Sequence, residues 1–295
     1  PRSRAARAAA PTPARSKVPD WSAFAGVTGV VLTLLLVLAR LSQDLAEPSA
    51  RGPALGGDGE PPDVEAPGAP FDAVDAGGGE ADVAGAGTDV PASWERALGD
   101  DGGDPGVGPL ALLANVAVSQ GTFAVLLLFG AWYAAVPASA LGLDAAAFAP
   151  IALLAGVAAG GVLYLANAGG AAVGRRMGVE GAEAFRAALA PETRRGWAVL
   201  LLVVLPIVAG FEELLFRGAL VGGLAAGFGV SPWLLAGLSS VAFALGHGAQ
   251  GRVGMVVTGL LGFGLAALFV VTESLPAVVV AHYLVNALEF VVNER

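Results

Sequence analysis

The chain has 295 residues, of which 55% are hydrophobic and 14% are charged, and its mean hydropathy is +0.69. This balance excludes an ordinary soluble domain and predicts a membrane protein, while the net charge of -9 argues against nucleic-acid binding because no sustained basic surface can neutralise phosphates. The chain has no cysteine, which excludes disulfide frameworks and cysteine-ligated metals.

The N-terminal region combines a basic tail with an apolar run. Residues 1–19 carry five basic side chains, and residues 20–42 are apolar enough and long enough to cross a bilayer. A signal peptide has a similar layout, but this run is long and no clear small-x-small cleavage site follows it. We therefore expect a retained first transmembrane helix whose basic flank stays in the cytoplasm.

Residues 43–108 differ completely from the rest of the chain. They carry fifteen acidic and two arginine side chains among many Gly, Pro and Ala residues. Such a segment cannot bury enough apolar surface to offset its ordering entropy, so we expect a disordered acidic loop without a chemical role. Together with a single lysine among sixteen basic residues, this acidity is typical of proteins from salt-loving archaea.

From residue 109 onwards the sequence predicts a helical membrane body, residues 109–295. Apolar runs of about 20 residues, the length that a helix needs to cross hydrocarbon, cover residues 109–136, 149–172, 196–222, 232–251, 253–271 and 275–292. With the first helix they make about seven spans, so the fold class is an all-α polytopic transmembrane bundle. We expect a multi-pass protein of the plasma membrane, in which abundant Gly and Ala allow close helix packing.

The loop at 173–195 leaves the orientation open. Strict alternation from a cytoplasmic N-terminus places this loop outside, yet its five arginines favour the inside. Within the loop, the segment EGAEAFRAALAPETRRG predicts a short interfacial helix that ends at Pro191.

Three ionisable residues stand out in the apolar run 196–222. Glu213 and Arg217 are four residues apart, so on a helix they share a face in the acid-first order that suits an ion pair. Glu212 points about 100° away and is free for another partner. A purely structural ion pair would leave this second carboxylate unexplained, and ionisable residues inside a membrane usually have a function.

Both histidines of the protein also lie in apolar segments. Phe243 and His247 are one helical turn apart, and so are His282 and Asn286. A lone histidine in a membrane helix often only donates a hydrogen bond to a neighbouring helix. A chance distribution, however, would more often place histidines in loops. Each of these residues lies near the depth of the two glutamates when the spans are centred, so we expect one buried polar cavity. Carboxylates, imidazoles, an amide and a guanidinium in such a cavity can activate water and stabilise an oxyanion.

Taken together, these three motifs resemble those of the CPBP family, the CAAX proteases and bacteriocin-processing enzymes that are also called the Abi family. They are Glu-Glu-x-x-x-Arg, Phe-x-x-x-His and His-x-x-x-Asn, and they occur in that order within residues 196–292. Any one of them is weak evidence, whereas three in order on membrane helices are specific. The resemblance does not extend to the first 195 residues.

The resemblance implies an intramembrane endopeptidase of the glutamate type. It implies that Glu212 and His247 activate the attacking water, that His282 and Asn286 stabilise the oxyanion, and that Glu213 and Arg217 hold the motif helix. It implies no cofactor. The alternative is a zinc-dependent protease that uses His247, His282 and a glutamate.

Two other classes of protein stay open from the sequence. A proton-coupled transporter also keeps buried Glu, Arg and His, although we find no convincing internal repeat. A non-catalytic membrane partner protein would be marked by the loss of a motif residue, and none is lost. The expected partners are membrane lipid and a membrane-associated peptide or protein substrate, which need not be a prenylated CAAX tail.

Overall fold

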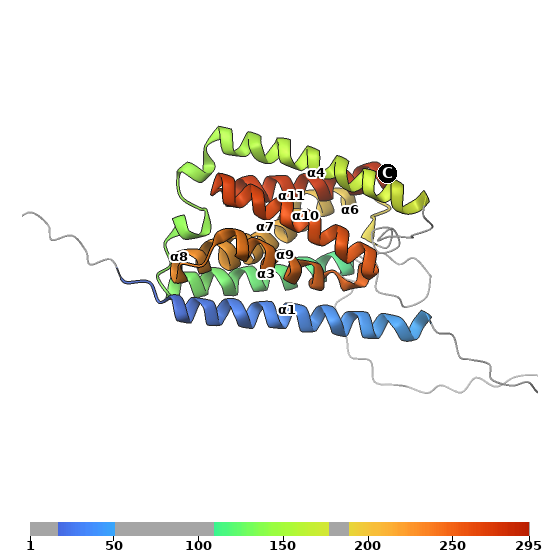
Figure 1. Cartoon of the computed structure of the whole chain (residues 1–295). Coiled ribbons are helices and arrows are strands. Elements are labelled where there is room, and N and C mark those ends of the chain that lie inside the picture. Colours follow the sequence, from blue (N-terminus) through green and yellow to red (C-terminus); the bar gives the residue numbers. More distant parts are fainter. Residues whose placement is uncertain (1–16, 51–108, 177–188, 295) are drawn as a thin grey trace, which may run out of the picture. The chain divides into compact units, whose positions relative to one another are not determined.

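Helices make up all the regular structure in the described part of the chain, which a computed structural model gives for residues 17–50, 109–176 and 189–294. Figure 1 shows the long helices lying side by side. They are α1 (Trp21–Ala50), α3 (Pro109–Tyr133), α4 (Pro150–Arg176), α6 (Arg194–Val199), α7 (Leu205–Glu213), α8 (Leu224–Phe228), α9 (Pro232–Gly246), α10 (Gly251–Thr272) and α11 (Leu275–Asn293). The described helices up to residue 45 and from residue 109 onwards belong to one compact unit.

Several short 3₁₀ and π segments join these helices. The 3₁₀ segments are η1 (Ala138–Leu141), η2 (Ala146–Phe148) and η5 (Gly248–Gln250), and the π segments are η3 (Leu200–Val204) and η4 (Leu214–Gly223). The elements α6, η3, α7, η4 and α8 follow each other without a break from residue 194 to residue 228 and form one long apolar span.

Within the described residues, six helical segments are long and apolar enough to cross a membrane, which confirms the all-α polytopic fold. One of the seven expected spans, residues 232–251, is wrong in its C-terminal boundary. α9 has only 15 residues and ends at Gly246, and the chain turns through η5 before α10 begins. Glycines at positions 246, 248 and 251 allow this turn, and Gly251 adopts a positive φ of 73° that disfavours other residues.

The N-terminal boundaries also differ from expectation. α1 continues to Ala50 instead of ending at residue 42, so the first residues of the acidic segment are helical. The remainder of that segment and residues 177–188, where most of the expected interfacial helix falls, lie outside the described residues.

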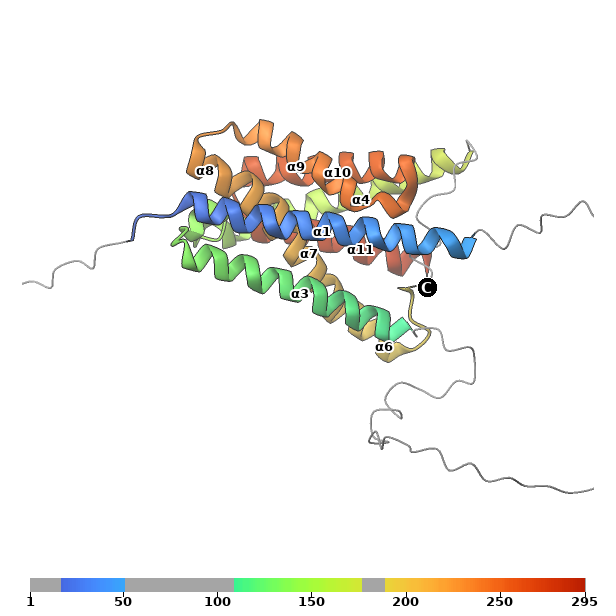
Figure 2. The same cartoon turned by 90° about the horizontal axis from the view of Figure 1, so that it is seen from below.

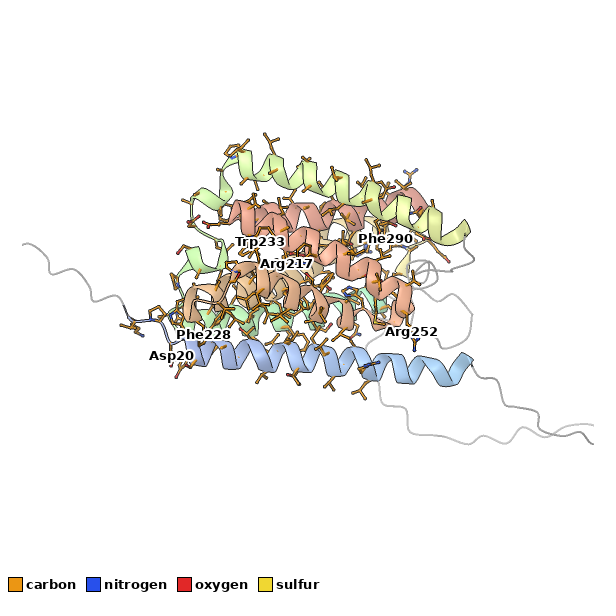
Figure 3. All side chains as sticks on the ribbon, viewed as in Figure 1. Asp20, Arg217, Phe228, Trp233, Arg252 and Phe290 are labelled. Carbon is orange, nitrogen blue, oxygen red and sulfur yellow. The ribbon has the colours of Figure 1, made fainter. Side chains whose placement is uncertain are left out.

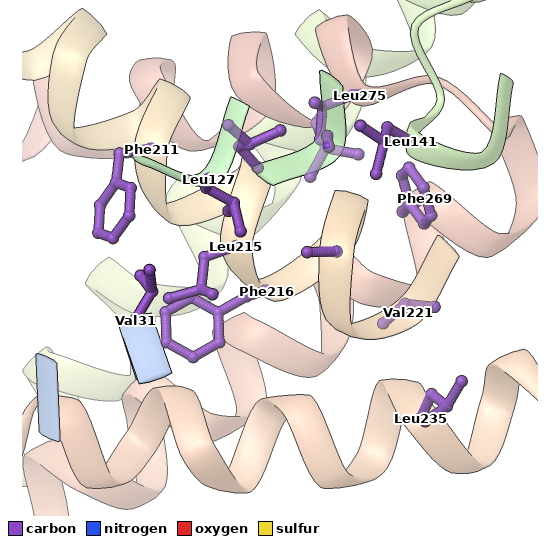
Figure 4. Close-up of a cluster of buried hydrophobic side chains, with 14 of the residues drawn as sticks. Val31, Leu127, Leu141, Phe211, Leu215, Phe216, Val221, Leu235, Phe269 and Leu275 are labelled. Atoms are coloured by element: carbon purple, nitrogen blue, oxygen red, sulfur yellow. The ribbon is translucent and has the colours of Figure 1, made fainter. Parts of the chain in front are cut away.

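The span 194–228 is the centre of the bundle. Of its most apolar stretch 56% is buried, whereas the corresponding values are 11% for the spans that contain α3 and α4. Figure 4 shows Leu215 and Phe216 of η4 packed near Val31 of α1 and Leu127 of α3. The outer helices expose apolar side chains, as a surface in contact with lipid tails requires.

α4 and α11 pack through glycines. A Cβ atom added to Gly156 would collide with the carbonyl oxygen of Ala277, and one added to Gly160 would lie 2.9 Å from that of Ala281. The constant offset between these pairs means that the two helices run parallel, and Figure 1 shows them side by side. This small-xxx-small packing fixes the helix that carries His282.

α1 lies against the bundle although it belongs to the N-terminal part of the chain. Figure 2 shows it running along the body beside α3 and α9. Val27 packs against Gly130 of α3, and Leu36 reaches Gly246 at the end of α9. The first helix is therefore part of the folded body.

Candidate active site

Arg217 lies at the centre of the candidate site and is fully buried. Figure 3 shows it inside the bundle, whereas Arg252 lies at one end. Its Nη1 donates to Glu213 Oε1 at 2.8 Å, and its Nη2 donates to the carbonyl oxygen of Gly262 in α10 at 2.7 Å. The predicted ion pair between Glu213 and Arg217 is thus present, and the guanidinium also stacks 4.8 Å above the ring of Phe243.

Glu213 holds a second donor from a helix far away in sequence. The Nδ1 atom of His282 in α11 lies 2.6 Å from Glu213 Oε1. Because Oε1 belongs to a carboxylate paired with Arg217, it accepts, and Nδ1 therefore carries the proton. This bond fixes the orientation of the imidazole and directs its Nε2 towards Glu212, whose Oε2 lies 3.7 Å away.

Glu212 and Glu213 are adjacent but have different surroundings. Glu213 is fully buried and binds two cationic or polar donors through one oxygen. Glu212 retains 8% exposure, and its contact with His282 is too long for a direct hydrogen bond. Among the described residues no ion pair joins Glu212 to His247, so their joint activation of a water molecule stays a prediction.

His247 caps α9 and does not lie within it, because the helix ends one residue earlier. Its Nδ1 lies 2.8 Å from the carbonyl oxygen of Phe243. A carbonyl can only accept, so Nδ1 carries the proton and the neutral ring keeps Nε2 as its basic nitrogen. Half-buried His247 is thus held with a free base position.

The ring of Phe243 separates the two histidines. Its centroid lies 4.5 Å from that of His247 and 6.0 Å from that of His282, and it makes an edge contact with Phe216 at 5.0 Å. Asn286 follows His282 by one turn on α11 and is half-buried. The structure therefore brings Glu212, Glu213, Arg217 and His282 into one group, connects His247 to it through Phe243, and places Asn286 on the same helix as His282.

Two supporting residues were not found from the sequence. The Gly262 carbonyl binds Arg217, and the Ser239 hydroxyl donates to the Phe216 carbonyl at 2.6 Å within the π segment η4. π segments are rare in proteins as a whole, but those that exist often lie at functional sites. No residue pattern predicted this one. The sequence shows Ser239 only as a serine within an apolar run, and its contact with the motif helix depends on how the helices pack.

A zinc site needs three or more suitable side chains around one point. Among the described residues, no group of three or more His, Cys, Asp and Glu side chains meets this requirement. His247 and His282 each keep an Nε2 atom, but their Nδ1 atoms are engaged elsewhere. A reaction without a metal stays a prediction.

Comparison with known proteins gives one family. Residues 194–288 match the model of the Rce1-like family, described as type II CAAX prenyl endopeptidase Rce1-like. No curated protein and no solved structure matches the chain. The matched region contains all three motifs, whereas α1, α3 and α4 lie outside it.

Proposed function

Since residues 194–288 carry the Rce1-like region of the CAAX protease family in a multi-pass membrane protein, we propose that this chain is an intramembrane endopeptidase. Its substrate is a membrane-associated peptide or protein, and its nucleophile is a water molecule activated by Glu212 and His247 without a metal ion.

The different surroundings of the two glutamates are the observation that supports this proposal most. Glu213 is committed to Arg217 and His282, so it serves to position other groups. Glu212 lies beside the same imidazole without a direct hydrogen bond to it. The Glu212 carboxylate therefore keeps acceptor capacity for a water molecule. Glu212 is therefore the carboxylate that can take a proton.

The proposed reaction follows from these positions. Glu212 removes a proton from the water with help from the free Nε2 of His247, and the water oxygen bonds to the scissile carbonyl carbon. His282 and Asn286 donate to the resulting oxyanion. The carbon–nitrogen bond then breaks, and the proton passes to the leaving amine. Loss of one oxyanion donor typically costs about 100 to 1,000-fold in rate.

Glu213 gives His282 the ability to act as such a donor. Because its carboxylate holds Nδ1–H, a protonated His282 ring presents Nε2–H to the site. Glu212 and Glu213 flank this ring, 3.7 and 2.6 Å from its two nitrogens. This arrangement assigns proton acceptance to Glu212 and hydrogen-bond donation to His282.

The test is hydrolysis of a peptide library in proteoliposomes, with prenylated and unmodified peptides in parallel. Wild type is compared with Glu212→Ala, His247→Ala and, as a matched control, the exposed Glu192→Ala. Elemental analysis of the same preparations measures bound zinc. We expect cleavage by wild type and the control, a loss of at least about 100-fold in the two site variants, and no stoichiometric metal.

Two results would contradict this proposal. Unchanged hydrolysis in both site variants would overturn the catalytic residues. About one zinc per chain, with activity lost on chelation and restored by zinc, would overturn the metal-free mechanism.

A further inference from the structure

The inward face of α3 carries a glutamine among apolar side chains. The buried and partly buried residues of this face are Leu113, Val116, Ala117, Phe123, Ala124, Leu127 and Ala131. Gln120 occupies the same face at helical spacing, between Ala117 and Phe123. A polar side chain at this position in a membrane helix needs a partner.

Gln120 has no such partner for its side-chain carbonyl. Its Oε1 atom is buried and, within the described residues, accepts no hydrogen bond. The neighbouring Ser119 and Thr122 bond to backbone carbonyls of their own helix, at 3.1 and 2.7 Å. Gln120 makes no such bond within its own helix, so burying its carbonyl oxygen lowers the free energy of unfolding without a compensating hydrogen bond.

The packing of α3 along α7 shows where the carboxamide lies. On one side of Gln120, Leu113 packs in a cluster with Leu205 and Phe290. On the other side, Phe123 stacks on Phe211, the residue before Glu212, with ring centroids 5.9 Å apart. Gln120 therefore lies beside α7 between the levels of these two contacts, about one turn from the Glu212 level.

Asn286 lies at the corresponding level of α11. His282 contacts Glu213, and Phe290 packs with Leu205, so the intervening Asn286 is level with the part of α7 between them. α3 and α11 thus bring two carboxamides to the same depth beside the motif helix. Asn286 belongs to the matched family region, whereas Gln120 lies outside it.

We infer that Gln120 is a substrate-binding residue that holds the backbone of the peptide next to the scissile bond. A carboxamide carries the same donor and acceptor as a peptide group, so the two can pair. The unpaired Oε1 would accept a backbone N–H of an extended peptide, which has no other partner inside the membrane. This inference rests on the proposed function and adds a contact from α3.

A binding role and a packing role have opposite effects on stability. Gln120→Leu removes a buried unpaired carbonyl while keeping most of the volume, so the melting temperature should stay equal or rise. If the glutamine instead served packing, the same change should lower it. Asn115→Leu on the exposed face of α3 is the matched control.

The kinetic test uses the best-cleaved peptide of the proteoliposome library, resynthesised with single N-methyl groups at each backbone nitrogen around the cut. For Gln120→Leu we expect KM to rise about 3 to 10-fold with kcat within twofold, the effect of one hydrogen bond. One N-methyl position should weaken wild-type cleavage by a similar factor and leave Gln120→Leu unaffected. The control should behave as wild type.

A lower melting temperature with unchanged KM, or N-methyl effects that are equal in both proteins, would overturn the inference. In either case wild-type cleavage and its dependence on Glu212 would still support the proposed function. A wild type that cleaves no peptide would overturn that function, and this inference with it.

Discussion

The two faces of the motif helix are built differently. On the closed face, Glu213 and Arg217 are fully buried and bonded to each other, to His282 and to the Gly262 carbonyl. On the open face, Glu212 keeps some exposure. His247 is half-buried against Phe243, and Asn286 is half-buried on α11, the helix that carries His282. Neighbouring carboxylates in one helix therefore have different surroundings.

This difference shows how a membrane protein can keep several ionisable groups in its interior. The closed face compensates each charge with partners, which stabilises the helix contacts and sets the orientation of His282. The open face leaves proton acceptors free. A substitution on the closed face should lower the stability of the fold, whereas a substitution on the open face should lower the reaction rate.

The largest expected effect comes from exchanging the glutamates for glutamine one at a time. Glu213→Gln leaves the buried Arg217 and His282 without their carboxylate, and breaking a buried pair costs about 3–5 kcal/mol. Glu212→Gln loses only a 3.7 Å contact, so its cost should be below about 1 kcal/mol. Detergent melting temperatures of both variants, compared with wild type, provide the measurement.

Each substitution is the control for the other, because the residues are adjacent and the chemical change is identical. Equal damage, or greater damage from Glu212→Gln, would show that the two faces do not differ as described.

A smaller effect is expected from the glycine seam behind His282. Gly160→Ala places a methyl group 2.9 Å from the Ala281 carbonyl oxygen, so α11 must shift or the seam must open, at about 1–3 kcal/mol. Gly161→Ala meets nothing within 4 Å and should be neutral or stabilising by about 0.5–1 kcal/mol. Thermal unfolding in detergent and peptide hydrolysis together measure both consequences.

If the closed face depends on this seam, Gly160→Ala should also lower activity, because His282 moves with α11. Similar stability and activity for the two alanine variants would show that the α4 contact does not position the site.

The smallest effect is expected from the acidic segment. Deletion of residues 55–100 should change neither face, because the composition of this segment does not support a packed core. We expect a monodisperse protein in detergent whose cooperative melting temperature stays within about 2 °C of wild type, a shift that corresponds to about 0.5–1 kcal/mol at most. Loss of cooperative unfolding would mean that the segment contributes to the helical body.

The local parts of the site could be predicted from the sequence, and the distant contacts could not. Helical spacing alone predicted the pair of Glu213 with Arg217, because four residues bring side chains together on one face. It could not predict that Glu213 also binds His282, since that contact depends on how α7 and α11 pack. For the same reason the sequence did not predict that His282 also lies 3.7 Å from Glu212.

The fold shows the same division. Apolar length predicted about seven spans, of which six are helices of spanning length in the described residues, but it merged α9 with the glycine-rich turn that follows and so placed His247 inside a helix. Hydropathy does not register a backbone turn when its residues are small and uncharged. The π geometry of η4 was not predictable either, because its residues are compatible with an ordinary α-helix.

The shortness of α9 gives the proposed reaction a direction across the membrane. Fifteen residues rise roughly 22 Å, whereas the hydrocarbon layer is about 30 Å thick. Tryptophan favours membrane interfaces, so with half-exposed Trp233 at one interface His247 would end short of the other, beside the turn whose Gln250 accepts a hydrogen bond from Thr258 of α10. In that arrangement we expect solutes to reach this histidine from the compartment that the turn faces and not from the opposite one. Hydrolysis would thus be vectorial, taking its water from a single compartment and returning the polar product to it.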